Sequence, residues 1–376
     1  MKRLISLTLA LLLVLFTLGS GAVTYADVES PAPTAEPEAP AAEETAEADP
    51  VNPYVGLWLA TGMEQDGVYA SLKDANEKMY FNFLSSGAIH AVAVEEEDAD
   101  EDYFAYRPTG ENTLDFFAEK DPYPCLFDPE TDTITIQDSD STAKIFLQRV
   151  TEDPLPDVFA LVDHSGEERN FYGYQATMAG TTKDLIQEFI AVGIDPRECY
   201  LTLDTDGTGY LQMGSEEAGG EITWTEDSIT PGSNPDSPAS YTWAGDHLLL
   251  EIQGMVIDFA PEGEVEALLL FMPTLTAEDV IGTWDLAKVV AGSDEITAED
   301  AKEKGMDMSF QFNEDGTAVM ISKGKTQGNL TWELKPFSVK LKAGSGANSI
   351  EMFSFVFEGD YMILNYIAKL YFERTE

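Results

Sequence analysis

The acidic side chains are the residues of this sequence that could most readily do chemistry. The 376 residues include 69 Asp and Glu against 21 Lys and Arg, 3 His and 2 Cys. A pair of carboxylates can hydrolyse a glycosidic bond, and a run of carboxylates can hold a divalent cation. Because so many acids bring some pair together in any fold, their abundance alone predicts no catalytic site.

Two acidic segments resemble metal-binding loops in composition. Asp204-x-Asp206-Gly207 looks like the middle of a calcium loop, but the twelfth loop position is Met213, where a bidentate Glu is required. We interpret this segment as a turn, because Asp-Gly suits a tight hairpin. Residues 95–102 hold seven carboxylates in eight positions. We interpret them as a solvated loop, with weak binding of divalent cations as the alternative.

The histidines and cysteines are too few and too scattered for a zinc site or a Ser–His or Cys–His catalytic device. His90, His164 and His247 have neither a Cys nor a second His at metal-ligand spacing, so each is interpreted as a satisfied or exposed side chain. The sequence leaves open whether Cys125 and Cys199 form a disulfide. We therefore predict no catalytic, cofactor-binding or metal-binding residues.

The N-terminal segment predicts secretion. Met1-Lys2-Arg3 is followed by an apolar stretch, Leu4–Leu18, and then by small residues, which is the pattern of a signal peptide over residues 1–26. The stretch is shorter than the roughly 20 residues that span a bilayer. Residues 27–53 are rich in Ala, Pro and Glu and contain no Lys or Arg, so we expect a disordered acidic linker. The expected location is extracellular.

The overall charge narrows the choice of partners. A formal net charge of −48 opposes phosphate backbones and anionic lipid headgroups. We therefore expect no nucleic-acid partner and no membrane insertion after signal cleavage. A hydrophobic content of 44% indicates a globular protein, and the length suggests two or three domains.

One sequence pattern occurs three times beyond the linker. Each copy has an opening aromatic residue and a Ser/Thr-x-x-Asp segment typical of a helix N-terminus. Each copy then has two apolar residues that lie six and four positions before a Gly. The successive glycines are 120 and 109 residues apart, which indicates duplicated whole domains. The matched segments are Gly56-Leu57-Trp58, Ser71–Asp74, Phe81, Phe83 and Gly87; Gly173-Tyr174, Thr181–Asp184, Leu201, Leu203 and Gly207; and Gly282-Thr283-Trp284, Thr297–Asp300, Phe310, Phe312 and Gly316.

The sequence predicts that most of these residues lie on short strands. Period-2 alternation between Asp-Gly turns predicts antiparallel meanders, with one short helix after the first strand of each copy. We predict an all-β protein with domains at 54–150, 165–272 and 277–376, and a linker at 151–164.

The opening Gly-x-Trp and a closing-strand Arg give domains 1 and 3 a family likeness. Together with the meander, they resemble the lipocalin-like barrels, especially the short versions repeated in secreted proteins of Gram-positive bacteria. The resemblance implies three tandem barrels, with Arg149 laid across Trp58 and Arg374 across Trp284 at one barrel end. The middle copy has neither partner, with Tyr174 at its opening, so we expect no such pair there.

These features predict a secreted, non-enzymatic binding or interaction protein. Its partner would be an unknown small apolar ligand or an extracellular or cell-wall component; the alternative is an extracellular hydrolase of polysaccharide or peptide that uses paired carboxylates. Bulky inward candidates favour filled barrels over a ligand cup. These candidates are Phe81, Phe83, Phe310, Phe312, Phe353, Phe355 and Phe357.

Overall fold

The computed structural model describes residues 52–375 apart from 73–76, 96–97, 120, 138–141, 153–156, 163–166, 215–218, 293, 345–348 and 366–367. The predicted signal peptide, nearly all of the predicted linker at 27–53, and His164 lie outside the described residues. The chain divides into two compact units, one ending at residue 163 and one beginning at residue 164. None of the described helices combines the length and the apolar character needed to cross a membrane.

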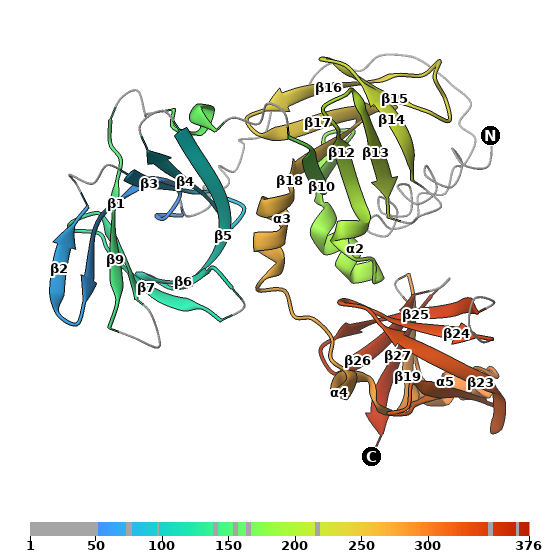
Figure 1. Cartoon of the computed structure of the whole chain (residues 1–376). Helices are drawn as coiled ribbons and strands as arrows, with labels where there is room; N and C mark the ends of the chain where they lie inside the picture. The colour runs from blue at the N-terminus through green and yellow to red at the C-terminus, as the bar shows by residue number, and fades with distance from the viewer. Residues whose placement is uncertain are drawn as a thin grey trace, which may run out of the picture. The chain divides into compact units, whose positions relative to one another are not determined.

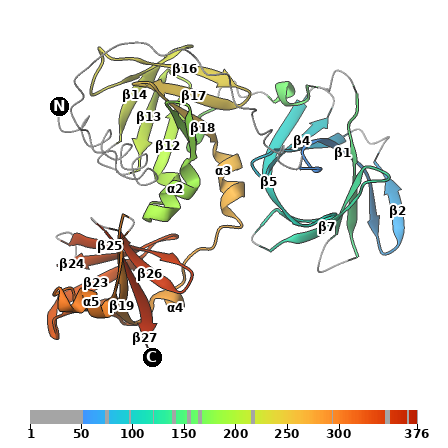
Figure 2. The ribbon, with the colours of Figure 1, turned by 180° about the vertical axis from the view of Figure 1, so that it is seen from behind.

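Domain 1 is a closed antiparallel barrel. Its strand β9 pairs back onto β1, so eight strands form the ring, and β2 lies outside it beside the second half of β1. Figures 1 and 2 show this ring from opposite sides. A 3-10 helix, η1 (Phe159–Leu161), follows the barrel. The strands are β1 (Gly56–Gln65), β2 (Val68–Ser71), β3 (Glu77–Phe83), β4 (Ala88–Glu95), β5 (Asp98–Gly110), β6 (Thr113–Phe117), β7 (Tyr123–Asp128), β8 (Thr133–Gln137) and β9 (Lys144–Arg149).

Domain 2 repeats this strand order and closes through β10 and β18. It has helices after its second strand and after its last strand. The elements are β10 (Arg169–Met178), β11 (Thr181–Asp184), α2 (Leu185–Val192), η2 (Pro196–Glu198), β12 (Cys199–Leu203), β13 (Thr208–Met213), β14 (Gly220–Trp224), β15 (Ser228–Pro231), β16 (Ala239–Ala244), β17 (His247–Ile252), β18 (Met255–Pro261) and α3 (Glu262–Leu269).

Domain 3 has the same order again and closes through β19 and β27. Its elements are α4 (Ala277–Val280), β19 (Gly282–Ala291), β20 (Asp294–Thr297), α5 (Ala298–Glu303), β21 (Met308–Phe312), β22 (Thr317–Ser322), β23 (Lys325–Leu334), β24 (Val339–Ala343), β25 (Ile350–Glu358), β26 (Tyr361–Asn365) and β27 (Lys369–Thr375). The prediction of an all-β protein with three tandem antiparallel meander barrels is confirmed.

The predicted helix follows a short second strand rather than the first strand. In domain 3, Thr297 caps α5 by accepting the backbone N–H of Asp300, as the sequence predicted. In domain 2 the cap of α2 is Asp184, which accepts the N–H of Gln187, so the expected cap at Thr181 is wrong. The matching segment of domain 1, residues 73–76, lies outside the described residues.

A Trp covered by an Arg closes one end of domain 1. Trp58 is fully buried, its indole N–H donates to the Tyr54 carbonyl at 2.8 Å, and the Arg149 guanidinium carbon lies 4.1 Å from the ring centroid. Gly56 has a φ of +128°, and a Cβ there would stand 3.0 Å from Arg149 Nη1. The glycine of Gly-x-Trp therefore leaves room for the guanidinium.

Domain 3 repeats this closure. Trp284 is buried, donates to the Val280 carbonyl at 2.8 Å, and lies under Arg374 at 5.1 Å. The positions that the family resemblance implied for both Trp–Arg pairs are confirmed.

The opening residue of domain 2 is Phe171 rather than Tyr174. In domain 1, Trp58 lies opposite Phe81 across the first pair of ring strands. In domain 2, the residue opposite Leu201, which matches Phe81, is Phe171. The prediction that Tyr174 is the opening residue is therefore wrong by three residues. It matched the pair Gly173-Tyr174 to Gly-x-Trp by residue type, whereas strand register identifies Phe171.

Domain 2 also has an arginine over aromatic rings, although the sequence predicted none. The guanidinium carbon of Arg169 lies 5.0 Å from the Phe171 ring centroid and 4.8 Å from that of Trp243. Arg169 comes from the first strand, two residues before Phe171, whereas Pro261 occupies the last-strand position opposite Phe171. A sequence pattern that requires an Arg in the last strand cannot detect an Arg in the first strand that covers the aromatic rings instead.

Domains 2 and 3 touch inside the second unit, where the C-terminal end of α2 meets domain 3. The buried Ser338 hydroxyl donates to the Gly193 carbonyl at 2.7 Å, and the Asn365 amide donates to the Ala191 carbonyl at 3.3 Å. A Cβ on Gly193 would stand 2.8 Å from Ser338 Cβ and 2.9 Å from a Val356 methyl. Glycine therefore permits this close approach.

The two cysteines are free and buried. Cys125 lies in the core of domain 1 and Cys199 in that of domain 2. Burial raises the pKa of each thiol to about 12, so both are unreactive while the barrels stay folded.

Candidate functional site

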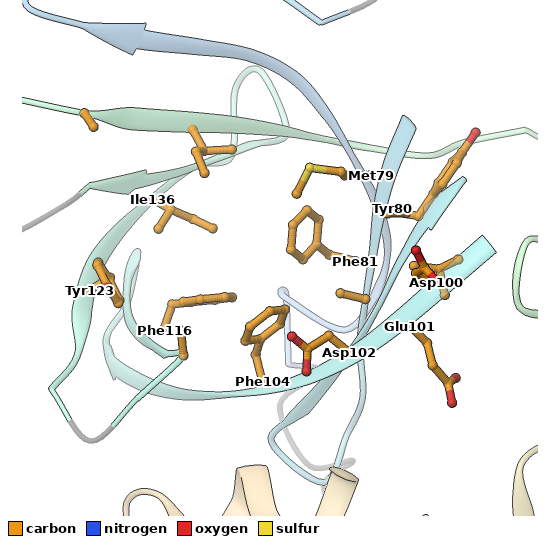
Figure 3. A pocket seen from close by; sticks show the side chains of 16 residues that line it. Met79, Tyr80, Phe81, Asp100, Glu101, Asp102, Phe104, Phe116, Tyr123 and Ile136 are labelled. Carbon is orange, nitrogen blue, oxygen red and sulfur yellow. The ribbon is translucent and has the colours of Figure 1, made fainter. Parts of the chain in front are cut away.

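The barrel of domain 1 contains a cavity of about 600 Å³ (Figure 3). Small-molecule sites typically measure about 300–1,000 Å³. The predicted filled core is therefore wrong for domain 1. The cavity is lined by Met79, Tyr80, Phe81, Ala91, Val92, Ala93, Asp100, Glu101, Asp102, Phe104, Phe116, Ala118, Tyr123, Ile136, Ala143 and Ile145.

Most of the cavity wall is apolar because alternate residues of each strand point inward. Figure 3 shows Phe81, Phe104, Phe116 and Ile136 around the open space. The Phe104 and Phe116 rings pack with centroids 5.1 Å apart, and Phe104 lies 6.5 Å from Phe81. Phe81, one of the two inward candidates in domain 1, thus forms part of the wall, whereas Phe83 packs in the core against Trp58.

A comparison of strand register explains why domain 1 is hollow. Phe81 of β3 faces Ala91 across the strand pair, whereas the matching Phe310 of β21 faces Met320. Met320 packs against the core of domain 3. Ala91 has three fewer heavy atoms than Met320, so the barrel interior of domain 1 has more space next to Phe81 than domain 3 has next to Phe310.

Three other matched positions are also smaller in domain 1. Each pair is identified by its register on the first strand or by the chain of paired strands that leads back to it. The pairs are Ala60 and Leu286, Leu147 and Phe372, and Cys125 and Phe355.

Of these four smaller positions, only Ala91 lines the cavity, whereas Ala60, Leu147 and Cys125 are buried in the core of domain 1. In domain 3 the buried Phe355 ring contacts Phe310, Phe312 and Phe372, with centroids 5.0–6.2 Å apart. A cysteine at that position leaves such a ring cluster without its centre. The core of domain 3 is thus filled by the phenylalanines that were predicted to point inward.

Several matched positions are larger in domain 1, among them Ile89, which corresponds to Ala318, and two that line the cavity. Phe104 and Phe116 of domain 1 correspond to Leu330 and Leu341 of domain 3. Because the two larger rings pack on each other at one wall, they leave the space beside Ala91 open.

Two carboxylates lie on the inward face of β5. Asp100 faces Ala93 and Asp102 faces Ala91 across the β4–β5 pair, and both are exposed to solvent. The Asp102 carboxylate accepts the backbone N–H of Tyr103 at 2.8 Å. Among the described residues that line the cavity there is no Lys, Arg or His.

Glu101 belongs to the other face of β5, and Figure 3 shows its side chain directed away from the cavity. Its carboxylate lies 2.6 Å from His90 Nε2. The His90 ring stacks on Tyr103 at 4.4 Å and packs against Phe159 of η1 at 4.6 Å. The interpretation of His90 as a satisfied side chain is confirmed.

His247 of domain 2 is held between two carboxylates. Its Nδ1 lies 2.8 Å from Asp258 and its Nε2 lies 2.9 Å from Glu264, which is 2% exposed. Burial by itself would lower the pKa of His247, but the hydrogen bonds and charges of the two acids outweigh it and raise the pKa to about 10. The charged ring therefore ties α3 to β17 and β18, which is a structural role.

The acidic turn at Asp204–Gly207 is a turn, as interpreted. The Thr208 hydroxyl and backbone N–H both donate to Asp206, which lowers the pKa of that carboxyl. Over the part of the chain that the structure describes, no three His, Cys, Asp or Glu residues are grouped to hold a metal ion. The side chains of residues 95–98 lie outside the described ones.

Comparisons with known proteins give no family. No family model matches the chain, and no curated protein matches it. A protein of unknown function from the DUF3598 family of Nostoc punctiforme is 10% identical, with 86% of this chain and 97% of that chain covered and a TM-score of 0.16. A DNA polymerase sliding clamp from Pseudomonas aeruginosa is 7% identical, with 87% and 93% covered and a TM-score of 0.15. Scores this low support no conclusion about function.

Proposed function

We propose that this protein is a secreted, non-enzymatic binding protein of lipocalin-like domains, in which domain 1 holds one small apolar molecule inside its barrel. The observation that carries the proposal is the cavity of about 600 Å³ between Phe81, Phe104 and Phe116. A preformed apolar cavity with few polar groups is the common form of a small-molecule site.

Under this proposal, domains 1 and 3 have different roles. Domain 1 is a compact unit of its own and has small side chains on the cavity wall at Ala91, Ala93 and Ala118, so it is the ligand-binding domain. Domain 3 uses the same fold with a packed phenylalanine core. It therefore suits a protein-contact or spacing role towards an extracellular or cell-wall partner.

The expected affinity is modest. A ligand with a ten-carbon chain that loses about 300 Å² of apolar surface gains roughly 7 kcal/mol at about 25 cal/mol per Å². Association and ordering cost several kcal/mol, whereas the preformed cavity limits that cost. With a cost of about 3 kcal/mol, the net gain is about 4 kcal/mol, and we expect dissociation constants on the order of 1 mM.

A cavity-filling variant tests the proposal with the full chain. Ala91→Met introduces the residue that domain 3 carries at the matching position, and Ala93→Met adds a second methionine at the next inward position of β4, which also lines the cavity. The double variant should lose the saturable binding of a fluorescent apolar probe that the unmodified chain shows at one site. Leu126→Met is the matched control, because Leu126 is 61% exposed on the outside of β7.

Two results would contradict the proposal. Equal probe binding by the filled variant, at equal folded content by circular dichroism, would place the probe outside the barrel. Turnover of any glycan or peptide polymer by the unmodified chain would contradict the non-enzymatic role.

A further inference from the structure

We infer that the molecule held by domain 1 carries a cationic head group, an amine or a quaternary ammonium, on an apolar body. The inference rests on the proposed function and adds the charge of the ligand. Its basis is the juxtaposition of the apolar cavity with Asp100 and Asp102 on the same inward face of β5 as Phe104.

The cavity is chemically one-sided. Phe81, Phe104, Phe116 and Ile136 offer apolar surface, whereas β5 offers carboxylates at the rim. An ammonium group near Asp102 would meet a carboxylate and the face of a nearby aromatic ring, both of which attract cations. A carboxylate head group would meet two like charges, because the lining has no basic residue to offset them.

Within the part of the chain that the structure describes, Asp100 and Asp102 form no ion pair, in contrast to two other acids of this barrel. Glu101, one residue away, is paired with His90, and Asp115 is paired with Arg107 at 3.3 Å. The one contact of the Asp102 carboxylate that the structure gives is the N–H of Tyr103 beside it. Asp102 therefore keeps acceptor capacity on the cavity side.

The negative net charge of the protein would also attract cations. The cationic ligand is therefore inferred from the position of Asp100 and Asp102 beside the cavity and not from the total charge. A long-range field acts on every surface of this acidic protein and is screened within about 10 Å at 0.1 M salt. Only the local carboxylates distinguish ligands that share one apolar chain and differ in head group.

Three probes with the same chain separate these effects: decylammonium, 1-decanol and decanoate. Each displaces the fluorescent apolar probe from the full chain in 0.1 M salt. We expect decylammonium to bind on the order of fivefold tighter than decanol, as for solvent-exposed charge pairs, and decanoate to bind weakest. The preference should shrink in 1 M salt.

Two charge-matched variants locate the preference. Asp100→Asn with Asp102→Asn should bring the ammonium-to-alcohol ratio close to one and leave decanol binding unchanged. The control, Glu111→Gln with Glu130→Gln, also removes two exposed carboxylates, but from turns outside the cavity lining, and should keep the ratio.

The outcomes distinguish the two proposals. Displacement by none of the three probes would contradict the proposed function itself. Displacement by all three with equal affinity, or a preference that survives the loss of Asp100 and Asp102, would overturn the cationic ligand and leave the apolar cavity standing.

Discussion

The Trp–Arg closure of domain 1 should act as one energetic unit. The test is a double-mutant cycle with Trp58→Leu, Arg149→Ala and the double variant, all in the full chain. Arg149 stacks on Trp58 at 4.1 Å, donates to Asp132 at 2.9 Å and donates to the Val55 carbonyl at 2.8 Å. Loss of either partner therefore removes the stacking contact.

The expected magnitudes follow from burial. Trp58 is 0% exposed, so Trp58→Leu should cost about 2–4 kcal/mol, below the usual cost of Trp→Ala because Leu refills part of the space. Arg149→Ala should cost about 1–3 kcal/mol, because its side chain is 23% exposed and its bonds with Asp132 are partly solvated. The stacking contact should give a coupling of about 0.5–2 kcal/mol.

The buried cysteines provide a domain-specific assay. Cys125 and Cys199 are the only two thiols of the chain, and each is buried in a different barrel. Pulsed thiol labelling in urea, read by mass spectrometry, therefore reports the unfolding of domain 1 at Cys125 and of domain 2 at Cys199. At a slope of about 1 kcal/mol per M urea, Trp58→Leu should lower the Cys125 midpoint by roughly 2–4 M.

Two outcomes would refute this reasoning. Effects of the single changes that add within about 0.3 kcal/mol in the double variant would show that the ring and the guanidinium do not act together. An equal shift of the Cys199 midpoint would show that the changes do not act on domain 1 alone.

Three further predictions concern domains 2 and 3. Because the pKa of His247 is raised to about 10 from 6.5, its stabilisation of domain 2 should be complete below pH 6.5 and lost as pH rises through 10; His247→Gln should remove this fall in urea midpoint. Gly193→Ala should collide with Ser338, and calorimetry should then show domains 2 and 3 melting separately. Arg169→Ala should destabilise domain 2 by about 0.5–2 kcal/mol, because the guanidinium covers Trp243; an unchanged Cys199 midpoint would contradict this.

The fold was predictable where local signals agreed with tertiary roles. Trp58 and Arg149 lie at the two ends of domain 1 in sequence but opposite each other across β1 and β9, so their repeated spacing carried tertiary information. Asp206 and Thr208 form their turn locally, and sequence describes such turns well. The short strand β2, fully exposed from Val68 to Ser71, lacked the alternation that identifies a half-buried strand.

The candidate site was not predictable in the same way. Phe81 and Phe310 are equivalent and both point inward, so the residue type at that position does not distinguish a hollow barrel from a filled one. The difference lies in their neighbours Ala91 and Met320, which become comparable only once strand register is known. The acidic run was interpreted as a loop, but Asp102 lies on a strand facing the cavity.

A crystal structure of the chain with 1-bromodecane, whose bromine is located by anomalous scattering, would show directly whether the domain 1 barrel holds an apolar molecule. We expect one bromine peak inside this barrel, among Met79, Phe81 and Phe116. A barrel interior without a peak, with bromine bound instead at the exposed Val68–Tyr69 hairpin, would contradict the claim that this barrel is a ligand site.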